Sequence, residues 1–572
     1  MGSIRQLLFT LVTYHLHLAT CHQIPLQVER PSLALTLTPL FEPVDLNVTS
    51  INVTMQLQNP KVHKGGVLVE LALGYGPIPT ARYDGDAIQA SDGAGPLGLI
   101  KVDTVNDGNP WRSWVLKRSP SGDVILSFTA PGRIPKPGEG TGPRIDLRVD
   151  QGGLVGKGMG FLPTPPGEDD WDFTVEWVLD GAPENYTGVW SAAPGVHSQI
   201  TGVPSEVIGN ACFAVGPLVR WVDPASPRLT VYWIGSPPWD MGKLSRKTAE
   251  IFDSISGYFG DTESDFTVFF RRVDQGHGGT GGYRSFLLEY DEGTEHEMSL
   301  SSLNSLLAHE IVHEYPLSYP VEEKEAWYIE GIADYYVSVI LRSTGVFTRE
   351  EALLELRSLA QAYYTSPVIH ISMDDVLRGR WGTVHAMRIP YSRGFVYLAK
   401  INGQIVAATN GTKSLDDVVM EMYRRQRARE PAQAAEFVQL VGDIIGHVKA
   451  QAGFDAMWRG DLIVPNGAPL LGFNLVRKDR FRFELGFDSN SMRTGIVAGL
   501  QKGSRAEEAG VREGDEIVSG FMVWTVADYY DMEMEMVVSR GPGSERLKWW
   551  PRSWDLVECW EWEDRKLSRS EL

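Results

Sequence analysis

Apolar and polar residues alternate along much of the first 235 positions, a pattern typical of strands with one buried face. In residues 51–57 every second side chain is apolar and the intervening ones are polar. The same alternation recurs in residues 144–150 and 171–177, with Gly- and Pro-rich stretches between them. These short strands and turns predict an N-terminal β-sandwich domain over residues 22–232.

The pattern changes near residue 233, where strands give way to longer segments of helical periodicity. A glycine-rich run at 274–282 is expected to be a loop or backbone close to a ligand, and residues 283–290 are expected to form an exposed edge strand. Helices are predicted at 242–259, 300–313, 322–342, 349–362, 415–427 and 432–451. Residues 233–468 therefore predict a second, mixed α/β and helical domain. Residues 469–565 return to short strands and predict a third domain, so the expected fold class is multidomain α+β.

Composition narrows the possible partners. The 572 residues carry a formal net charge of −20, which argues against nucleic acid and anionic membrane surfaces as partners. Beyond the N-terminus no stretch approaches the ~20 apolar residues of a membrane span, so no transmembrane segment is expected. With three cysteines far apart in sequence, a disulfide framework is not expected either.

The first residues resemble a targeting segment. One positive charge, an apolar run and small residues near Cys21 predict a secretory signal peptide over residues 1–21. Four glycosylation sequons agree with a secreted, extracellular protein, although a couple arise by chance in a chain this long. They are Asn47, Asn52, Asn185 and Asn410.

The strongest chemical signal is the sequence His309-Glu310-Ile311-Val312-His313. On a helix this spacing places both imidazoles on one face, where each can give one nitrogen to a tetrahedral Zn²⁺. Glu330, in the next predicted helix, is the expected third ligand, and Asp334 one turn later is expected to hold a ligand histidine from behind. We therefore predict one Zn²⁺ per chain, with Glu310 as the catalytic base.

A chance match on a solvated helix is the competing interpretation of this motif. The apolar residues Leu303, Leu307 and Ile311 indicate a packed helix instead. Buried His and Glu side chains need partners, and a metal ion supplies them.

Three segments resemble a known family. The stretches HEIVHEY and WYIEGIADYY are similar to the gluzincin peptidases, and residues 390–395 (PYSRGF) resemble the segment that carries the catalytic tyrosine of gluzincin aminopeptidases, with arginine for lysine. The C-terminal stretches FELGF and GIVAGLQKGSRAEEAGVREGDEIVS resemble a PDZ domain. This combination is similar to the glycyl aminopeptidase family. The resemblance implies a thermolysin-like catalytic domain, an oxyanion-stabilising role for Tyr391, and a carboxylate-binding loop at Leu485, Gly486 and Phe487 for a C-terminal peptide ligand.

The resemblance also has a gap. Gly281, Gly282, Tyr283 and Arg284 occupy the expected substrate-binding stretch, but the glutamate that grips the free amine in these aminopeptidases is missing. The expected function is a secreted zinc-dependent peptidase acting on a peptide or protein substrate, an aminopeptidase related to glycyl aminopeptidases. A zinc endopeptidase, a zinc hydrolase of a non-peptide bond and a catalytically vestigial PDZ-containing binding protein remain open as alternatives.

Overall fold

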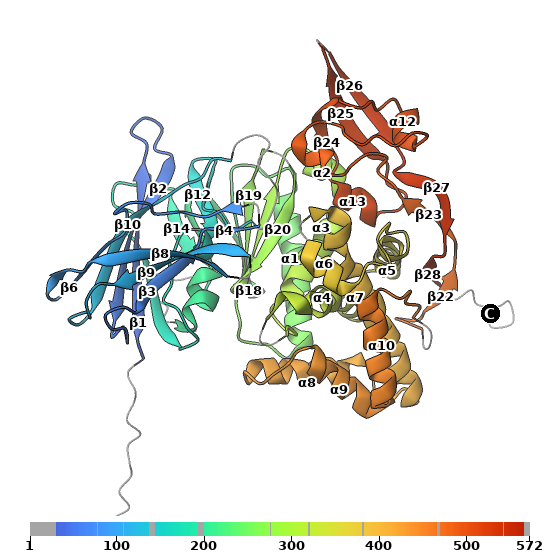
Figure 1. Ribbon diagram of the computed structural model, residues 1–572, viewed down its shortest axis with the longest axis horizontal. Coiled ribbons are helices and arrows are strands. Elements are labelled where there is room, and N and C mark those ends of the chain that lie inside the picture. The colour runs from blue at the N-terminus through green and yellow to red at the C-terminus, as the bar shows by residue number, and fades with distance from the viewer. Residues whose placement is uncertain are drawn as a thin grey trace, which may run out of the picture.

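A computed structural model describes residues 30–564 except 77, 107, 136–143, 193–199, 275, 319–320, 380–381, 466–468 and 542. The predicted signal peptide, residues 1–21, lies outside the described residues. Figure 1 shows strands of the first half of the chain on the left, helices in the centre and below, and the C-terminal strands at the upper right. The predicted mixed, multidomain α+β architecture is confirmed.

The described part of the N-terminal region forms three larger sheets and one short hairpin. A seven-stranded sheet contains β1 Ser32–Phe41, β2 Val48–Gln58, β6 Gln89–Asp92, β7 Gly95–Pro96, β10 Val124–Pro131, β13 Trp171–Trp177 and β15 Ile200–Gly202. A three-stranded sheet contains β3 Val67–Ala72, β8 Leu99–Asn106 and β9 Asn109–Leu116, and the hairpin joins β4 Gly74–Tyr75 to β5 Ile78–Pro79. A four-stranded sheet contains β11 Arg148–Asp150, β12 Gly153–Lys157, β14 Thr187–Trp190 and β16 Cys212–Gly216. Short helical turns lie at η1 Gly158–Gly160 and η2 Ser205–Gly209.

Alternation along the strands places the core between these sheets. In β2 the predicted inward positions are fully buried, and they pair with equally buried positions of β1, for example Leu33 opposite Leu57. The same alternation in β10 buries Val124, Leu126 and Phe128. Period-two patterning thus decided which face of the large sheet is covered.

A five-stranded sheet follows, in the order β17-β18-β19-β21-β20. Its strands are β17 Leu218–Asp223, β18 Ser226–Ile234, β19 Phe266–Arg272, β20 Gly278–Gly282 and β21 Ser285–Tyr290. The sheet therefore begins before the expected boundary at residue 233.

The expected edge strand at 283–290 is wrong: β21 lies between β19 and β20, all six of its residues are buried, and the glycine run forms the edge as β20. Packing explains why this run pairs as a strand. A Cβ at Gly279 would lie 1.8 Å from Cζ of Phe286, so the aromatic ring of β21 covers the backbone of β20. Only glycine leaves room for that ring.

Helices cover one side of this sheet (Figure 1). They are α1 Met241–Tyr258, α2 Thr294–Glu297, α3 Leu300–Val312, α4 Ala326–Ser343 after the turn η3 Glu323–Glu325, α5 Arg349–Tyr364, α6 Met373–Gly379, α7 Val384–Ala408, α8 Leu415–Arg427, α9 Ala434–Ile445 and α10 His447–Arg459. Among the described residues, no helix combines the length and the apolar character that crossing a bilayer requires.

Two glycines let α4 and α7 cross at close range. A Cβ at Gly331 would lie 2.6 Å from Cα of Gly394, and a Cβ at Gly394 would lie 2.1 Å from the carbonyl oxygen of Trp327. Backbones that approach this closely exclude any side chain between them. The crossing therefore determines how near residues of α7 come to Glu330, which precedes Gly331.

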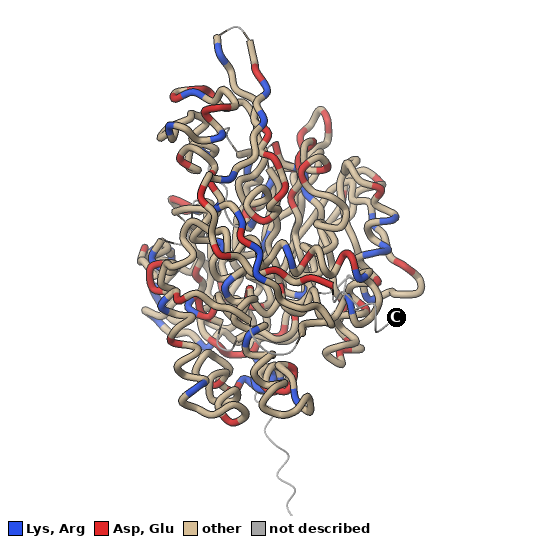
Figure 2. The backbone as a smooth tube through the Cα atoms, turned by 90° about the vertical axis from the view of Figure 1, so that its right-hand side faces the viewer, with Lys and Arg blue, Asp and Glu red and all other residues tan. Residues whose placement is uncertain are grey.

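The described residues of the C-terminal segment form small sheets and three short helices. Its strands are β22 Phe473–Arg477, β23 Arg480–Phe483, β24 Glu516–Gly520, β25 Met534–Arg540, β26 Gly543–Trp549, β27 Arg552–Val557 and β28 Trp560–Asp564. Its helices are α11 Ser491–Thr494, α12 Arg505–Glu508 and α13 Val523–Asp528. Seen from the side on the right of Figure 1, acidic and basic residues are interspersed along the chain (Figure 2).

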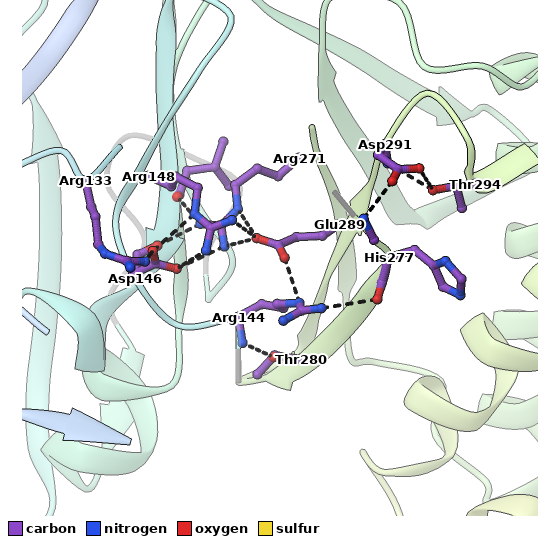
Figure 3. Close-up of polar contacts among 12 residues, drawn as sticks. Arg133, Arg144, Asp146, Arg148, Arg271, His277, Thr280, Glu289, Asp291 and Thr294 are labelled. Carbon is purple, nitrogen blue, oxygen red and sulfur yellow. Dashed lines mark hydrogen bonds and ion pairs between the residues drawn. The ribbon is translucent and has the colours of Figure 1, made fainter. Parts of the chain in front are cut away.

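A buried cluster of charges joins the N-terminal region to the five-stranded sheet (Figure 3). Arg271 of β19 is fully buried, and its guanidinium donates to Glu289 of β21 at 3.0 Å and to Asp146 at 3.2 Å. Arg148 pairs with the same two carboxylates, and Arg144 pairs with Glu289 at 2.6 Å. Burial alone would raise the pKa of Glu289, but the surrounding arginines lower it. Every buried charge of the cluster therefore has an opposite neighbour, and removal of one would leave another unpaired.

The first prediction concerns the helix crossing. Replacing Gly394 by alanine forces a methyl group against the backbone of α4, so we expect Gly394→Ala to lower the free energy of unfolding by about 1–3 kcal/mol in urea denaturation. Gly453→Ala in α10 is the matched control, because no atom beyond its own helix lies near its added Cβ. This control is expected to gain about 0.5–1 kcal/mol. Equal unfolding midpoints for the two variants would contradict the close crossing.

The second prediction concerns the charge cluster. Glu289→Gln leaves the buried arginines short of one negative charge, and we expect a loss of about 3–5 kcal/mol of unfolding free energy. Glu292→Gln removes an exposed ion pair with Arg272 and is expected to cost less than about 1 kcal/mol. Thermal unfolding of both variants measures the difference, and a mild effect at Glu289 would show that the cluster is dispensable.

Candidate metal and active site

Helix α3 carries the first part of the candidate site. It begins at Ser299, whose hydroxyl accepts a hydrogen bond from the Ser302 N–H, and His313 stands at its C-terminal cap. Leu303, Leu307 and Ile311 are fully buried in the core. This packing leaves the opposite side of the helix, with both histidines and Glu310, facing a cleft.

The three predicted ligands converge. Nε2 of His309 lies 3.1 Å from Nε2 of His313 and 3.3 Å from Oε2 of Glu330, and Nε2 of His313 lies 3.5 Å from the same oxygen. One ligand atom from each residue lies within 4.8 Å of the others, the only such grouping among the described residues. Two helices, α3 and α4, therefore bring the three side chains to one point.

Asp334 lies behind this point. Its Oδ1 is 2.7 Å from Nδ1 of His309, and it is buried. A carboxylate there holds the proton on Nδ1 and leaves the Nε2 lone pair aimed at the ligand cluster. Two imidazole lone pairs and a carboxylate oxygen so close together repel one another without a cation, and this donor set suits Zn²⁺. The residues present fit a zinc ion.

Glu310 lies between the ligands and the edge of the sheet. A Cβ at Gly281 would be 3.3 Å from Oε2 of Glu310, so the carboxylate lies directly against strand β20. Burial raises the pKa of Glu310, and the adjacent His313 and His309 act in the opposite direction. The carboxylate thus stands beside both the ligand cluster and the strand.

Tyr391 approaches the cluster from α7. It lies inside this helix, directly after Pro390, in a stretch between residues 362 and 415 for which no helix was predicted. Its ring stacks on the His309 ring with a centroid distance of 5.6 Å and an interplanar angle of 18°. Tyr391 lines the same cleft as Glu310.

The cleft is large and passes along β20. Its volume is about 2410 Å³, and Gly281, Gly282 and Tyr283 line it together with the metal-ligand cluster. Arg284 is not among the lining residues: its guanidinium lies over the Tyr283 ring at 5.4 Å, and its backbone N–H donates to the Glu314 carboxylate. Of the four expected substrate-binding residues, three therefore line the cleft.

The remaining predicted residues lie elsewhere. In the predicted carboxylate-binding loop, Leu485 and Phe487 are only 4% and 3% exposed, and the Leu485 carbonyl accepts a hydrogen bond from Trp549. None of the three residues of this loop lines the cleft, although the next residue, Asp488, does. The sequons at Asn52, Asn185 and Asn410 are exposed, and Asn47 is partly exposed.

Sequence reasoning missed several neighbours of the site. Lys157 of β12 is buried, and its ammonium donates to the Gly281 carbonyl. Glu314 lines the cleft next to His313, and Trp524 of α13 contacts Tyr391 from more than a hundred residues away in sequence. Glu314 could have been found by its position beside the motif. The other two carry no sequence signal, because only tertiary packing brings them here.

Comparisons place this geometry among known folds. No protein-family model matches the chain, and no curated protein matches it. Among solved structures, an aminopeptidase N family protein from Idiomarina loihiensis shares 14% identity at a TM-score of 0.59, over 91% of this chain and 96% of that one. The M1 zinc metallopeptidase from Deinococcus radiodurans shares 17% identity over 77% and 95% of the two chains, with a TM-score of 0.45. Native yeast LTA4 hydrolase shares 13% identity over 77% and 70%, with a TM-score of 0.47. At these identities the likeness is one of fold, and the chain has the multidomain fold of the aminopeptidase N family protein.

The third prediction tests the ligand cluster through Asp334. Asp334→Asn keeps the shape of the side chain but weakens its hold on His309, so we expect zinc affinity to fall about 10–100-fold. Competition with a chromophoric chelator measures the affinity. Asp253→Asn, an exposed aspartate on α1, is the control and is expected to bind zinc as the unaltered protein does. Unchanged affinity in Asp334→Asn would remove Asp334 from the metal site.

Proposed function

We propose that this protein is a zinc-dependent peptidase that hydrolyses peptide bonds, with His309, His313 and Glu330 as zinc ligands. The observation that carries the proposal is the convergence of two Nε2 atoms and one carboxylate oxygen beside Glu310, on the wall of a cleft bounded by an edge strand. A protein that only binds a partner has no need of a partly buried carboxylate beside a metal-ligand cluster in a cleft.

The chain's own residues divide the chemistry among them. Zinc at this site supplies a Lewis acid for the scissile carbonyl and lowers the pKa of water toward neutrality. Glu310 accepts the proton of the attacking water and passes it to the leaving amine. Tyr391 donates a hydrogen bond to the oxygen that gains negative charge, while Asp334 keeps His309 in the correct tautomer.

Strand β20 aligns the substrate. It is the terminal strand of its sheet in the described topology, and it lies next to Glu310. An extended peptide adds to such an edge through main-chain hydrogen bonds, which align the chain without reading its side chains. The glycines leave the approach to the strand open, so the scissile bond can lie close to the ligand cluster.

The proposal also concerns whether the enzyme recognises the free N-terminus of its substrate. We favour an aminopeptidase, because the solved structures that the chain resembles include an aminopeptidase N family protein. The chain's relation to the glycyl aminopeptidases rests on the resemblance of the sequence motifs. Glu206 and Glu314 are two of the acidic residues that line the cleft and could receive a free amine. An endopeptidase is the second candidate. The missing amine-gripping glutamate favours it, and so does a cleft larger than the roughly 300–1,000 Å³ of small-ligand sites.

Two further parts of the proposal rest on sequence. The segment 1–21 and the exposed sequons support a secreted glycoprotein. The resemblance of residues 469–565 to PDZ domains supports a domain of that class, with a C-terminal peptide as its possible ligand.

The fourth prediction tests the catalytic assignment. Glu310→Gln removes the base but none of the ligands, so we expect about one zinc per chain and a fall in kcat of at least about 10²-fold. His313→Ala removes a ligand, and we expect it to lose both zinc and activity. Zinc content by emission spectroscopy and hydrolysis of peptide libraries are the measurements. Full activity in Glu310→Gln would refute the base assignment.

The same libraries separate exopeptidase from endopeptidase activity. Cleavage confined to peptides with a free N-terminus supports the aminopeptidase. Equal cleavage of N-acetylated peptides supports the endopeptidase, and zinc binding without cleavage of either library contradicts the proposed function.

A further inference from the structure

Helix α13 of the C-terminal segment lies in the same cleft as the metal-ligand cluster. Met522, Val523, Trp524 and Asp528 all line that cleft, together with residues of α3 and α7. Helix α13 packs against α5 and α7, while its Val523 and Val526 belong to the same apolar core as residues of β25 and β26. A C-terminal element thus forms a wall of the candidate active site.

Trp524 contacts the candidate catalytic tyrosine directly. The two rings meet edge to face, with a centroid distance of 5.4 Å and an interplanar angle of 85°. The Tyr391 ring also stacks on His309. Tyr391 therefore contacts both a candidate metal-ligand histidine and a tryptophan from the C-terminal segment.

Arg388 and Asp528 complete this arrangement. The Arg388 guanidinium lies 4.8 Å from the Tyr391 ring centroid and 4.6 Å from that of Trp524. It donates to both carboxylate oxygens of Asp528, at 2.8 and 2.6 Å, and the Trp524 side chain also hydrogen-bonds to Asp528. A bidentate pair of this kind fixes the plane of the guanidinium, and hence the rings that lie against it.

Helix α13 is itself anchored from two sides. The Met522 N–H donates to Glu297 at 3.1 Å, which ties the start of α13 to α2. At the other end Arg552, fully buried, donates to the carbonyls of Val526 and Tyr529 at 3.1 and 3.3 Å. The position of Trp524 is therefore set by both the catalytic region and the C-terminal segment.

We propose that Trp524 is a positioning residue for Tyr391: together with Arg388 and Asp528 it holds the tyrosine ring against His309. This inference rests on the proposed peptidase function, because Tyr391 acts there on the developing negative charge. The C-terminal segment is then part of the catalytic unit rather than an appended module. Displacement of a catalytic group by even 1 Å costs on the order of 10²-fold in rate.

The experiment compares four full-length proteins in steady-state kinetics. We expect Trp524→Ala to lower kcat by about 10-fold or more, with little change in KM or zinc content. We expect Trp524→Phe to recover most of kcat, because phenylalanine restores an aromatic edge beside Tyr391. Trp554→Ala is the matched control, since Trp554 is 55% exposed in β27 of the same segment, and it is expected to keep the activity of the unaltered protein. Unaltered kcat in Trp524→Ala, or a change in KM alone, overturns the proposal.

A double substitution separates positioning from a general structural effect. If Trp524 acts through Tyr391, then Tyr391→Phe combined with Trp524→Ala has the kcat of Tyr391→Phe alone. Multiplicative losses overturn the proposal. If Trp524→Ala does not fold, Arg388→Lys takes its place in the same cycle, because lysine keeps the charge opposite Asp528 but not the flat contact with both rings.

A readout without catalysis distinguishes failure of this inference from failure of the proposed function. If the unaltered protein binds zinc but cleaves no peptide, the proposed function fails. Melting temperatures then decide the contact: non-additive shifts for Tyr391→Ala and Trp524→Ala support the held ring, and additive shifts overturn it.

Discussion

The crossing of α4 and α7 at Gly331 and Gly394 is the constraint on which the candidate site depends. Glu330 precedes one glycine and Tyr391 lies three residues before the other, so backbone contact sets their separation. Helix–helix distance is normally set by side chains of variable length. Here it is set by two main chains, which cannot adjust by changing rotamers. The candidate ligand Glu330 and Tyr391, whose ring stacks on His309, are thereby held at a fixed separation.

The buried charges fix the position of strand β20 in a similar way. Strand β20 is mostly glycine and contributes little packing of its own. It is held from behind by the Phe286 ring and from the side by Arg144, whose backbone N–H donates to Thr280 and whose guanidinium donates to the His277 carbonyl. A strand with a single side chain, that of Thr280, is thus held in place by groups from β21 and from the N-terminal region. Burying charged groups costs free energy, but here the buried charges give strand β20 a defined position.

Local periodicity accounts for what sequence could predict. The alternation in residues 51–57 places the buried face of β2 correctly, and the four-residue spacings in α3 and α4 place His309, His313, Glu330 and Asp334 on facing sides of two helices. These relations depend only on the pitch of one element. For the ligand-bearing sides of α3 and α4 to face each other, the two helices only had to pack together across a short connection.

Non-local packing accounts for what sequence could not predict. The glycine run resembles a loop because its strand character comes from Phe286, and β21 was misplaced at the edge for the same reason. Helix α13 has six residues and no periodicity to detect, so its arrival beside Tyr391 left no trace in the pattern. Because α13 lies at residues 523–528, it leaves the ribosome after the other elements that line the cleft. One wall of the cleft is then absent from any nascent chain that ends before residue 523, so order of synthesis alone delays the complete candidate site until α13 has been made.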